Sequence, residues 1–306
     1  MPQRSRGHPG QGSGTPRYPG TFLLAFREAT AKLNWQVRKW HGSHVECLDA
    51  EGREHVVGLE NLYRRARRHD RGNWPTVITE FLAAVSTGDA VETMPDDLAE
   101  VADRLLVRLG TPLKSMPADA KVWGRPLDDT GLCINLVIDF ANRMFYVTEK
   151  LVADSDRPGE EWLERALANL LQRSPADCFQ PIHEESEMLL CSVGDAYDSS
   201  RALLLGTLLP ETAALGCFVT LASRDELMVL PVSTEALEQV HMLRVLAEKT
   251  FPTAPYPISA EVFWVHEGIW RLFPIEIKGQ EVNIRLPAEF VPLLGQLAPP
   301  EDDQPT

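Results

Sequence analysis

Apolar residues recur at helical spacing in the first third of the chain. Phe22, Phe26, Ala29 and Leu33 are three or four positions apart, which places them on one face of an amphipathic helix. By the same criterion, helices are predicted over residues 21–33, 59–68, 74–85 and 96–109. Short β-prone runs next to turn-forming residues predict strands over residues 36–40, 44–48 and 55–57. We therefore expect a helical region with a small hairpin.

The pattern changes after residue 131, where pairs of apolar strands alternate with helices. Strand pairs are predicted at 132–140 with 144–148, at 179–183 with 188–193, and at 217–221 with 227–230. The helices that follow these pairs are predicted over residues 160–171, 199–209 and 234–251. The chain then closes with four short strands, over residues 262–265, 270–273, 274–277 and 282–286.

Two of these units are similar to each other. "CINLVIDFANRMFYV", which begins at Cys133, and "CFVTLASRDELMVL", which begins at Cys217, each contain a strand, an Ala-x-Arg turn and an apolar strand with a methionine. This similarity indicates a duplicated ββα unit. Strand pairs followed by helices are typical of an α+β fold and not of a doubly wound parallel sheet. The predicted architecture is α+β: a helical N-terminal region with a small hairpin, repeated ββα units, and a C-terminal β-hairpin extension.

A stretch rich in Pro, Asp and Lys without periodicity, residues 113–131, predicts a linker between two domains. The Gly-, Pro-, Ser- and Arg-rich N-terminus has no apolar segment of the kind found in secretory signals. The predicted parts are a disordered tail (1–20), an N-terminal α+β domain (21–112), the linker (113–131), a C-terminal α+β domain (132–298) and a second disordered tail (299–306).

Composition narrows the class of protein. The 306 residues carry a net charge of −14, which argues against a whole molecule devoted to nucleic acid, because phosphate contacts need a clustered positive surface. No stretch approaches the roughly 18 apolar residues that span a bilayer, so no membrane association is expected. The five cysteines form no C-x-x-C pair and several lie in apolar runs, which favours buried, reduced thiols and a cytoplasmic location. No cofactor is expected.

Four segments resemble one bacterial protein family. The segment "GLENLYRRARRHDRGNWPTVITEFLAAV" is similar to the L-x-N-L-Y segment of the YtpQ-like family (domain of unknown function 1444), and "GDAYDSSRALL" to its G-D-x-Y-D-x-S-R-L-L stretch. "LASRDELMVL" and "APYPISAEVFWVHEGIWRLF" resemble its later hairpins, although Ser223 replaces an expected Asn and the strands after Phe273 extend beyond the match. The resemblance implies a bacterial cytosolic protein of a family without an assigned activity, so it transfers no catalytic role.

The segment from Gly194 to Arg201 is the strongest candidate for chemistry. It lies between a predicted strand and a predicted helix, where backbone N–H groups and side chains are presented together. Asp195 and Asp198 are candidate catalytic carboxylates, and Arg201 a candidate anion clamp. Further binding candidates are Tyr197, Ser200, Arg224 and Asp225, the last two because equivalent turns of repeated units often share an edge. The alternative is structural: Asp198 or Ser199 caps the helix, and Arg201 pairs with an acid.

A second candidate is a dense basic run in this acidic chain: Arg64, Arg65, Arg67, Arg68 and Arg71. It predicts either a solvated helix face or a site for phosphate or a partner, with Arg64, Arg65 and Arg68 as binding candidates. Metal binding is not expected. His183 with the nearby glutamates lacks a second histidine at ligand spacing, and His41 and His44 are interpreted as flanking a turn.

Three functions remain open. The chain has no P-loop, no G-x-G-x-x-G and no G-x-S-x-G motif, and this favours a non-enzymatic protein-binding or regulatory module whose partner is another protein. The second hypothesis is an enzyme built around Asp195, Asp198 and Arg201. The third is nucleic-acid or anion binding through the run from Arg64 to Arg71.

Overall fold

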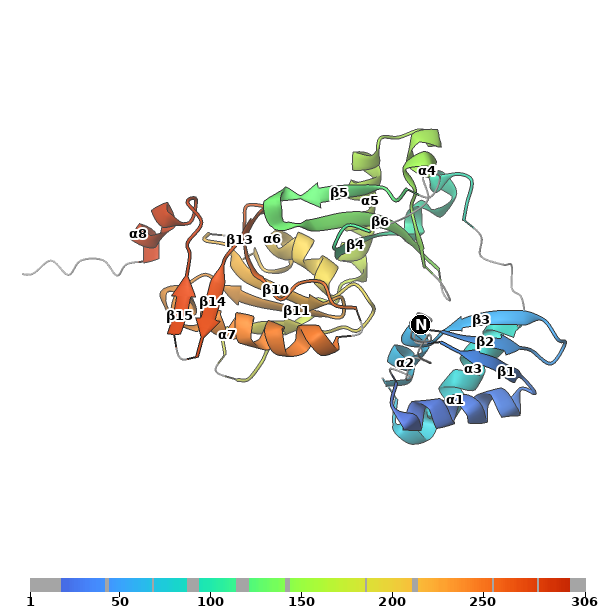
Figure 1. Cartoon of the computed structure of the whole chain (residues 1–306). Coiled ribbons are helices and arrows are strands. Elements are labelled where there is room, and N and C mark those ends of the chain that lie inside the picture. Colours follow the sequence, from blue (N-terminus) through green and yellow to red (C-terminus); the bar gives the residue numbers. More distant parts are fainter. Residues whose placement is uncertain are drawn as a thin grey trace, which may run out of the picture. The chain divides into compact units, whose positions relative to one another are not determined.

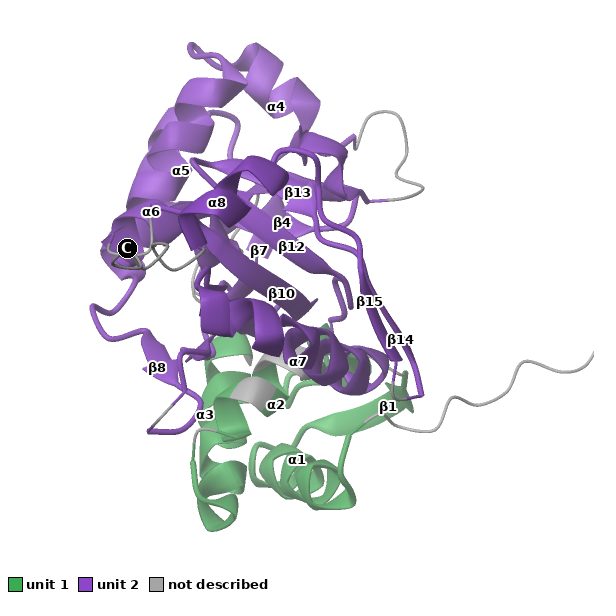
Figure 2. Cartoon of the chain, turned by 90° about the vertical axis from the view of Figure 1, so that its left-hand side faces the viewer, with its two compact units in different colours: residues 1–91 green, residues 92–306 purple. Residues whose placement is uncertain are grey.

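The computed structural model describes residues 18–41, 44–67, 69–86, 94–113, 121–140, 144–184, 186–210, 214–254, 256–279 and 281–297. Figure 1 shows the elements in sequence order, and Figure 2 colours two compact units, residues 1–91 (unit 1) and 92–306 (unit 2). Each unit has its own hydrophobic core. None of the described helices is long and apolar enough to cross a membrane.

Unit 1 packs helices against one face of a three-stranded antiparallel sheet with the order β1-β2-β3. Its elements are α1 (Gly20–Lys32), β1 (Gln36–Trp40), β2 (His44–Leu48), β3 (Glu54–Gly58), α2 (Leu59–Arg67), η1 (Arg71–Asn73) and α3 (Trp74–Ser86). Val45 and Cys47 are two positions apart on β2 and therefore point to the same face, where they pack with Phe22 and Phe26 of α1. Burial of these side chains holds the helices on the sheet.

The first sheet of unit 2 is centred on β6 (Leu132–Asp139). β4 (Leu105–Gly110) pairs along one edge of β6, and β5 (Gly124–Leu127) and β7 (Met144–Tyr146) pair along the other. The helical segments before, between and after these strands in the sequence are η2 (Leu98–Arg104), η4 (Asp128–Thr130), α4 (Glu149–Asp154) and α5 (Gly159–Arg173). Trp162, Ala166 and Leu170 of α5 are three or four positions apart and belong to the same buried core as β4 and β6.

The second sheet of unit 2 has six antiparallel strands in the order β13-β12-β10-β11-β9-β8. The strands are β8 (Phe179–Pro181), β9 (Leu189–Cys191), β10 (Cys217–Ser223), β11 (Glu226–Pro231), β12 (Val262–His266) and β13 (Ile269–Leu272). Successive side chains of β10 point to opposite faces of the sheet and pack in two different hydrophobic cores. Val219 packs in the core shared with the first sheet, whereas Phe218 packs on the opposite face with Val240 and Leu243 of α7 (Thr234–Thr250).

The remaining elements lie between or after these strands. They are η5 (Ser199–Leu204), α6 (Leu205–Leu208), η7 (Phe251–Thr253), the hairpin of β14 (Ile275–Lys278) and β15 (Glu281–Ile284), η8 (Val291–Leu293) and α8 (Leu294–Leu297). Phe273 and Phe290 pack their rings at 5.4 Å and are fully buried, so the C-terminal extension contributes to the core on the α7 side of the sheet.

The α+β fold predicted from the sequence is confirmed, as are the strand pairs and most helices. One helix prediction is wrong: residues 96–109 contain η2 and then strand β4. Because β4 pairs along β6, the chain joins unit 2 before the predicted linker, and β5 lies inside that linker. The division therefore falls after residue 91 and not at 113–131.

Two smaller corrections concern chain ends and the helix after β9. The predicted tails, 1–20 and 299–306, lie outside the described residues except for 18–20, and these belong to unit 1 because Tyr18 is buried and Gly20 begins α1. The helix predicted over 199–209 is a 3-10 segment, η5, followed by the single turn α6. The two similar ββα units belong to different sheets, β6–β7 to the first and β10–β11 to the second.

Candidate functional site

The Gly194–Arg201 segment forms a tight loop between β9 and η5. Gly194 and Ala196 have positive φ angles of 76° and 79°, a conformation that turns the backbone sharply. The turn brings the Asp198 carboxylate back onto the preceding loop, where Oδ1 accepts a hydrogen bond from Val193 N at 2.7 Å and Oδ2 accepts one from Gly194 N at 2.9 Å. Asp198 makes no capping hydrogen bond to η5, so the predicted role as a helix cap is wrong. It fastens the loop instead.

Arg201 neutralises both carboxylates of the segment. Its Nη1 and Nη2 donate to the two oxygens of Asp195 at 2.9 and 2.7 Å, a bidentate contact, and Nη1 also lies 3.2 Å from Asp198 Oδ1. Its Nε donates to Ser174 Oγ at 3.0 Å. Arg201 and Asp198 have 0% of their surface exposed, so this ion cluster is internal to the fold.

The electrostatics of the cluster follow from its burial. Loss of solvent, together with the neighbouring Asp195 charge, raises the pKa of Asp198 to about 6, although the backbone N–H groups act in the opposite direction. Burial also acts to raise the pKa of Asp195, but the contacts with Arg201 outweigh it and hold this pKa below its usual value. The Arg201 N–H groups in these contacts point at Asp195, Asp198 and Ser174, and the Arg201 side chain is not exposed to solvent. A buried, internally paired cluster does not present a nucleophile, an acid or a base to a substrate.

A second layer of the cluster reaches the surface. Arg173 at the end of α5 pairs with Asp139 and lies 3.4 Å from Asp195 Oδ2, and its guanidinium carbon is 5.2 Å from the Tyr197 ring centroid. Tyr197 is 1% exposed, and burial together with Asp139 raises the pKa of its hydroxyl. Tyr197 therefore packs inside the fold and does not line a surface that a ligand can reach.

The structure brings the remaining predicted residues of this region together. Ser200 Oγ accepts a hydrogen bond from Leu109 N of β4 at 3.0 Å, and Ser199 N donates to the Arg224 carbonyl at 3.1 Å. Arg224 is 3% exposed and pairs with Asp225 at 3.0 Å. The helix predicted over 96–109 gives no reason to include Arg108, yet on β4 this residue is next to Leu109, which bonds Ser200, and its guanidinium shares the Tyr256 ring with Arg224.

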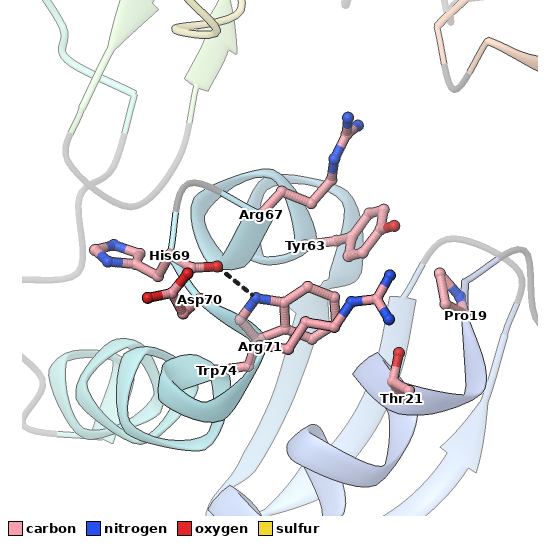
Figure 3. A pocket seen from close by; sticks show the side chains of 8 residues that line it. All are labelled: Pro19, Thr21, Tyr63, Arg67, His69, Asp70, Arg71 and Trp74. Atoms are coloured by element: carbon pink, nitrogen blue, oxygen red, sulfur yellow. Dashed lines mark hydrogen bonds between the residues drawn. The ribbon is translucent and has the colours of Figure 1, made fainter.

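The basic run lies on α2 and η1 of unit 1 and is exposed where it is described. Arg65, Arg67 and Arg71 are exposed, whereas Arg68 and the side chain of Arg64 lie outside the described part of the chain. Arg67 and Arg71 line a pocket of about 320 Å³ together with Pro19, Thr21, Tyr63, His69, Asp70 and Trp74 (Figure 3). Arg65 does not line it. Within the described residues, neither Arg67 nor Arg71 has an ion-pair partner.

Aromatic side chains form the rigid part of this pocket. Trp74 is 5% exposed, and its indole Nε1 donates to the His69 carbonyl at 3.1 Å, which fixes the turn between α2 and α3. The Tyr63 ring packs edge-on against Trp74 with a centroid separation of 6.0 Å. The guanidinium carbon of Arg67 lies 5.8 Å from the Tyr63 centroid. Figure 3 shows the Arg71 side chain extending towards Tyr63, Pro19 and Thr21.

The first turn of α1 forms the opposite wall. Pro19 and Thr21 flank the start of this 13-residue helix, and its N-terminal N–H groups carry the positive end of the helix dipole. The first turn has no acidic residue, and Pro19 provides no side-chain cap. The helix start therefore adds to the positive potential of the two arginines.

Charge is distributed unevenly between the units. Residues 1–91 contain 13 Lys and Arg against 9 Asp and Glu, a net charge of +4, whereas residues 92–306 contain 17 against 35, a net charge of −18. The negative overall charge of −14 therefore comes from unit 2, and unit 1 is net positive. The net negative charge that disfavours nucleic-acid binding by the whole chain is therefore not a property of unit 1.

The histidines that were interpreted as turn residues also lie close together. His41, His44 and Glu46 have potential ligand atoms within 4.8 Å of one another. The two imidazole rings are stacked at 4.2 Å with an angle of 13° between their planes, and His41 Nε2 is 2.8 Å from Glu46 Oε1. Nitrogen lone pairs lie in the ring plane, so nearly parallel rings do not direct them at one ion. The arrangement fits a polar turn.

Comparison of the chain with protein-family models, with curated proteins and with solved structures finds no match. The resemblance to the YtpQ-like family therefore stays a prediction. The function has to be argued from the geometry of the chain itself.

Proposed function

We propose that this chain is a non-enzymatic binding module of the bacterial cytoplasm that recognises an anionic group, a phosphate or a carboxylate, on a partner protein. The pocket of unit 1 is the proposed site. The observation that carries the proposal is that Arg67, Arg71 and the residues at the start of α1 line one pocket, into which Arg71 extends (Figure 3), with no ion-pair partner for either arginine among the described residues.

The chemistry of the pocket suits a single oxyanion. A guanidinium group presents N–H donors in a planar fork that matches phosphate and carboxylate oxygens, and the first N–H groups of a helix add donors without a side chain. The aromatic rings of Tyr63 and Trp74 limit the motion of the wall on which the arginines stand. A ligand that binds here gains charge-assisted hydrogen bonds of about 1.5–3 kcal/mol each.

The other candidate for chemistry, the Asp195–Asp198–Arg201 cluster, does not support an enzyme as well. Its charges pair with one another, and Asp198 and Arg201 are wholly buried. An active site needs a side chain that a substrate can reach. We therefore assign this cluster a structural role and place recognition in unit 1.

The test is a ³¹P NMR titration in which the full chain is added to O-phospho-L-serine, with Arg67→Gln and Arg71→Gln as variants. Arg65→Gln is the matched control. Arg65 is exposed on α2, as Arg67 is, but it does not line the pocket, so its substitution removes the same charge without changing the site. We expect wild type and Arg65→Gln to shift the phosphate resonance saturably, and either pocket variant to weaken binding about tenfold or more. Equal affinities for all four proteins, or no saturable shift in any, would contradict the proposal.

Nucleic-acid binding through the basic run predicts a different pattern. A polyanion contacts many exposed arginines, so Arg65→Gln would weaken binding to duplex DNA as much as Arg67→Gln does. Its affinity would also fall with salt, with a log–log slope of roughly −0.9 for each phosphate contact. A single-anion pocket predicts that Arg65→Gln changes little and that the salt slope stays near that of one or two contacts.

A further inference from the structure

Arg108 in unit 2 carries a positive charge without a carboxylate partner. It lies on β4, is half-buried, and donates from Nη1 to the Met144 sulfur at 3.2 Å. Its guanidinium carbon is 5.8 Å from the ring centroids of both Tyr146 and Tyr256. No ion pair involves Arg108 in the described part of the chain. The Met144 sulfur and the two tyrosine rings replace only part of the hydration that the Arg108 guanidinium loses on burial.

A second arginine lies against the same ring. The guanidinium carbon of Arg224 is 3.6 Å from the Tyr256 centroid, and Arg224 is almost wholly buried. The carboxylate of Asp225 is engaged by Arg224, with Nε–Oδ1 at 3.0 Å and Nη2–Oδ2 at 3.4 Å. Among the described residues, the contacts around Tyr256 therefore involve two guanidinium cations and one carboxylate. Burial, and after it the positive charge of Arg224, lower the pKa of Arg108.

The backbone fixes this group in place. Leu109 N, next to Arg108, donates to Ser200 Oγ at 3.0 Å, and Ser199 N donates to the Arg224 carbonyl at 3.1 Å. Arg224 N donates to the Tyr256 carbonyl at 3.0 Å. β4, η5, the β10–β11 turn and the Tyr256 loop are thus tied together, so the two arginines cannot separate to relieve their repulsion without breaking these bonds.

We propose that the half-buried Arg108 binds the carboxylate or phosphate group of a small molecule, with Tyr146 and Tyr256 flanking the bound group and the buried Arg224 adding positive charge from its contact with Tyr256. An oxyanion supplies negative charge to this group. It also accepts hydrogen bonds from Arg108 N–H groups that bond no protein oxygen within the described residues. This site uses only residues of unit 2 and does not depend on the pocket of unit 1.

Methionine NMR tests the proposal, because Met144 touches Arg108 directly. The full chain is labelled with ¹³C at the methionine methyl groups and titrated with inorganic phosphate and with acetate, at constant ionic strength held by chloride. We expect one of the two anions to shift the Met144 methyl signal saturably. The methyl group of Met242, which is exposed on α7, should not move and reports non-specific effects. The anion that saturates distinguishes a phosphate ligand from a carboxylate ligand.

Variants assign the shift to the arginine. Arg108→Gln should weaken the saturating anion about tenfold to a hundredfold, the loss expected for one or two charge-assisted hydrogen bonds. Arg104→Gln is the matched control, since Arg104 is exposed just before β4 and stacks 5.1 Å from the Phe140 ring centroid, and it should bind as wild type does. A wild-type Met144 signal that does not respond to either anion would overturn the site, whether or not Arg108→Gln folds. So would an unchanged affinity in a folded Arg108→Gln protein.

Discussion

Replacement of Asp198 by alanine should destabilise unit 2 far more than loss of a helix cap does. Four donors face this carboxylate: Val193 N at 2.7 Å, Gly194 N at 2.9 Å, Arg201 Nη1 at 3.2 Å and the Cys191 sulfur at 3.8 Å. A cap at a helix start contributes about 1 kcal/mol. Asp198→Ala instead leaves loop N–H groups without acceptors and Arg201 with one carboxylate fewer.

The magnitude follows from burial. Removing one partner of a buried ion pair costs about 3–5 kcal/mol, because the other charge stays buried without full compensation. Arg201 keeps its bidentate contact with Asp195, so we expect the lower end, about 3 kcal/mol. Asp198→Asn keeps one acceptor oxygen and places an amide beside another donor. It should therefore cost less than alanine at neutral pH.

The pH dependence of the asparagine variant has a defined sign. Burial raises the pKa of Asp198 from its usual 3.8 to about 6, so the stability that this group contributes is fully present below pH 3.8 and is lost as the pH rises through 6. Asparagine does not titrate. The difference between wild type and Asp198→Asn should accordingly shrink by about 1 kcal/mol between pH 5 and pH 7.

Urea denaturation followed by far-UV circular dichroism at the two pH values measures all three quantities. A loss of 1 kcal/mol or less for Asp198→Ala would mean that the carboxylate does not hold the loop. A difference for Asp198→Asn that grows with pH would show that the buried carboxylate is stabilised as an anion, and the argument from burial would fail.

Three further predictions concern other parts of the fold. All five cysteine thiols are buried, and burial raises the pKa of Cys47 to about 11. Iodoacetamide at pH 8 should therefore label the native chain hardly at all and the unfolded chain fully, as measured by mass spectrometry; rapid native labelling would contradict this. Gly216→Ala should lower the thermal midpoint much more than Gly268→Ala. Both glycines have φ near 80°, but only at Gly216 would an added Cβ lie 2.1 Å from the Val265 carbonyl oxygen. Equal losses in the two variants would refute the steric explanation. Burial acts to raise the pKa of Asp49, but hydrogen bonds from His55 and Arg53 outweigh burial and hold this pKa at about 2. Asp49→Asn should therefore lower the unfolding midpoint of unit 1 above pH 3.8, and the difference from wild type should vanish as the pH falls through 2. A difference that does not depend on pH would count against this prediction.

Periodicity predicts most of the fold because most elements bury one face. The bounds predicted for β1 and β2 agree with the structure. The prediction for α1 differs by one residue at each end, and that for α7 differs by one residue at its C-terminal end. β4 was missed for a physical reason. Leu105, Leu106, Val107 and Leu109 are all buried, so the strand has apolar residues on both faces and no period of two. A continuous apolar run does not distinguish a strand from a buried helix.

The candidate sites show a different limit. The sequence marks Asp195, Asp198 and Arg201 as a group, and the structure brings them into contact. The sequence does not reveal that these side chains are buried, because their burial depends on β4 and α5, which are distant in the sequence. Arg108 belongs to no local sequence motif, and only tertiary contacts with η5 and the Tyr256 ring bring it beside Arg224. In the basic run, the helix spacing of Arg67 and Arg71 did not indicate that α1 completes the pocket.

Amide-detected NMR of the full chain, titrated with O-phospho-L-serine, tests the proposed function most directly. The account predicts that the backbone amide signals of Gly20 and Thr21 and the Trp74 indole signal shift together and saturate at one affinity. Thr21 and Trp74 line the pocket, and Gly20 lies between the lining residues Pro19 and Thr21. Arg71→Gln should abolish the shifts and Arg65→Gln should leave them intact. Shifts that map elsewhere in unit 1, or that persist in Arg71→Gln, would contradict recognition of an anion at this site.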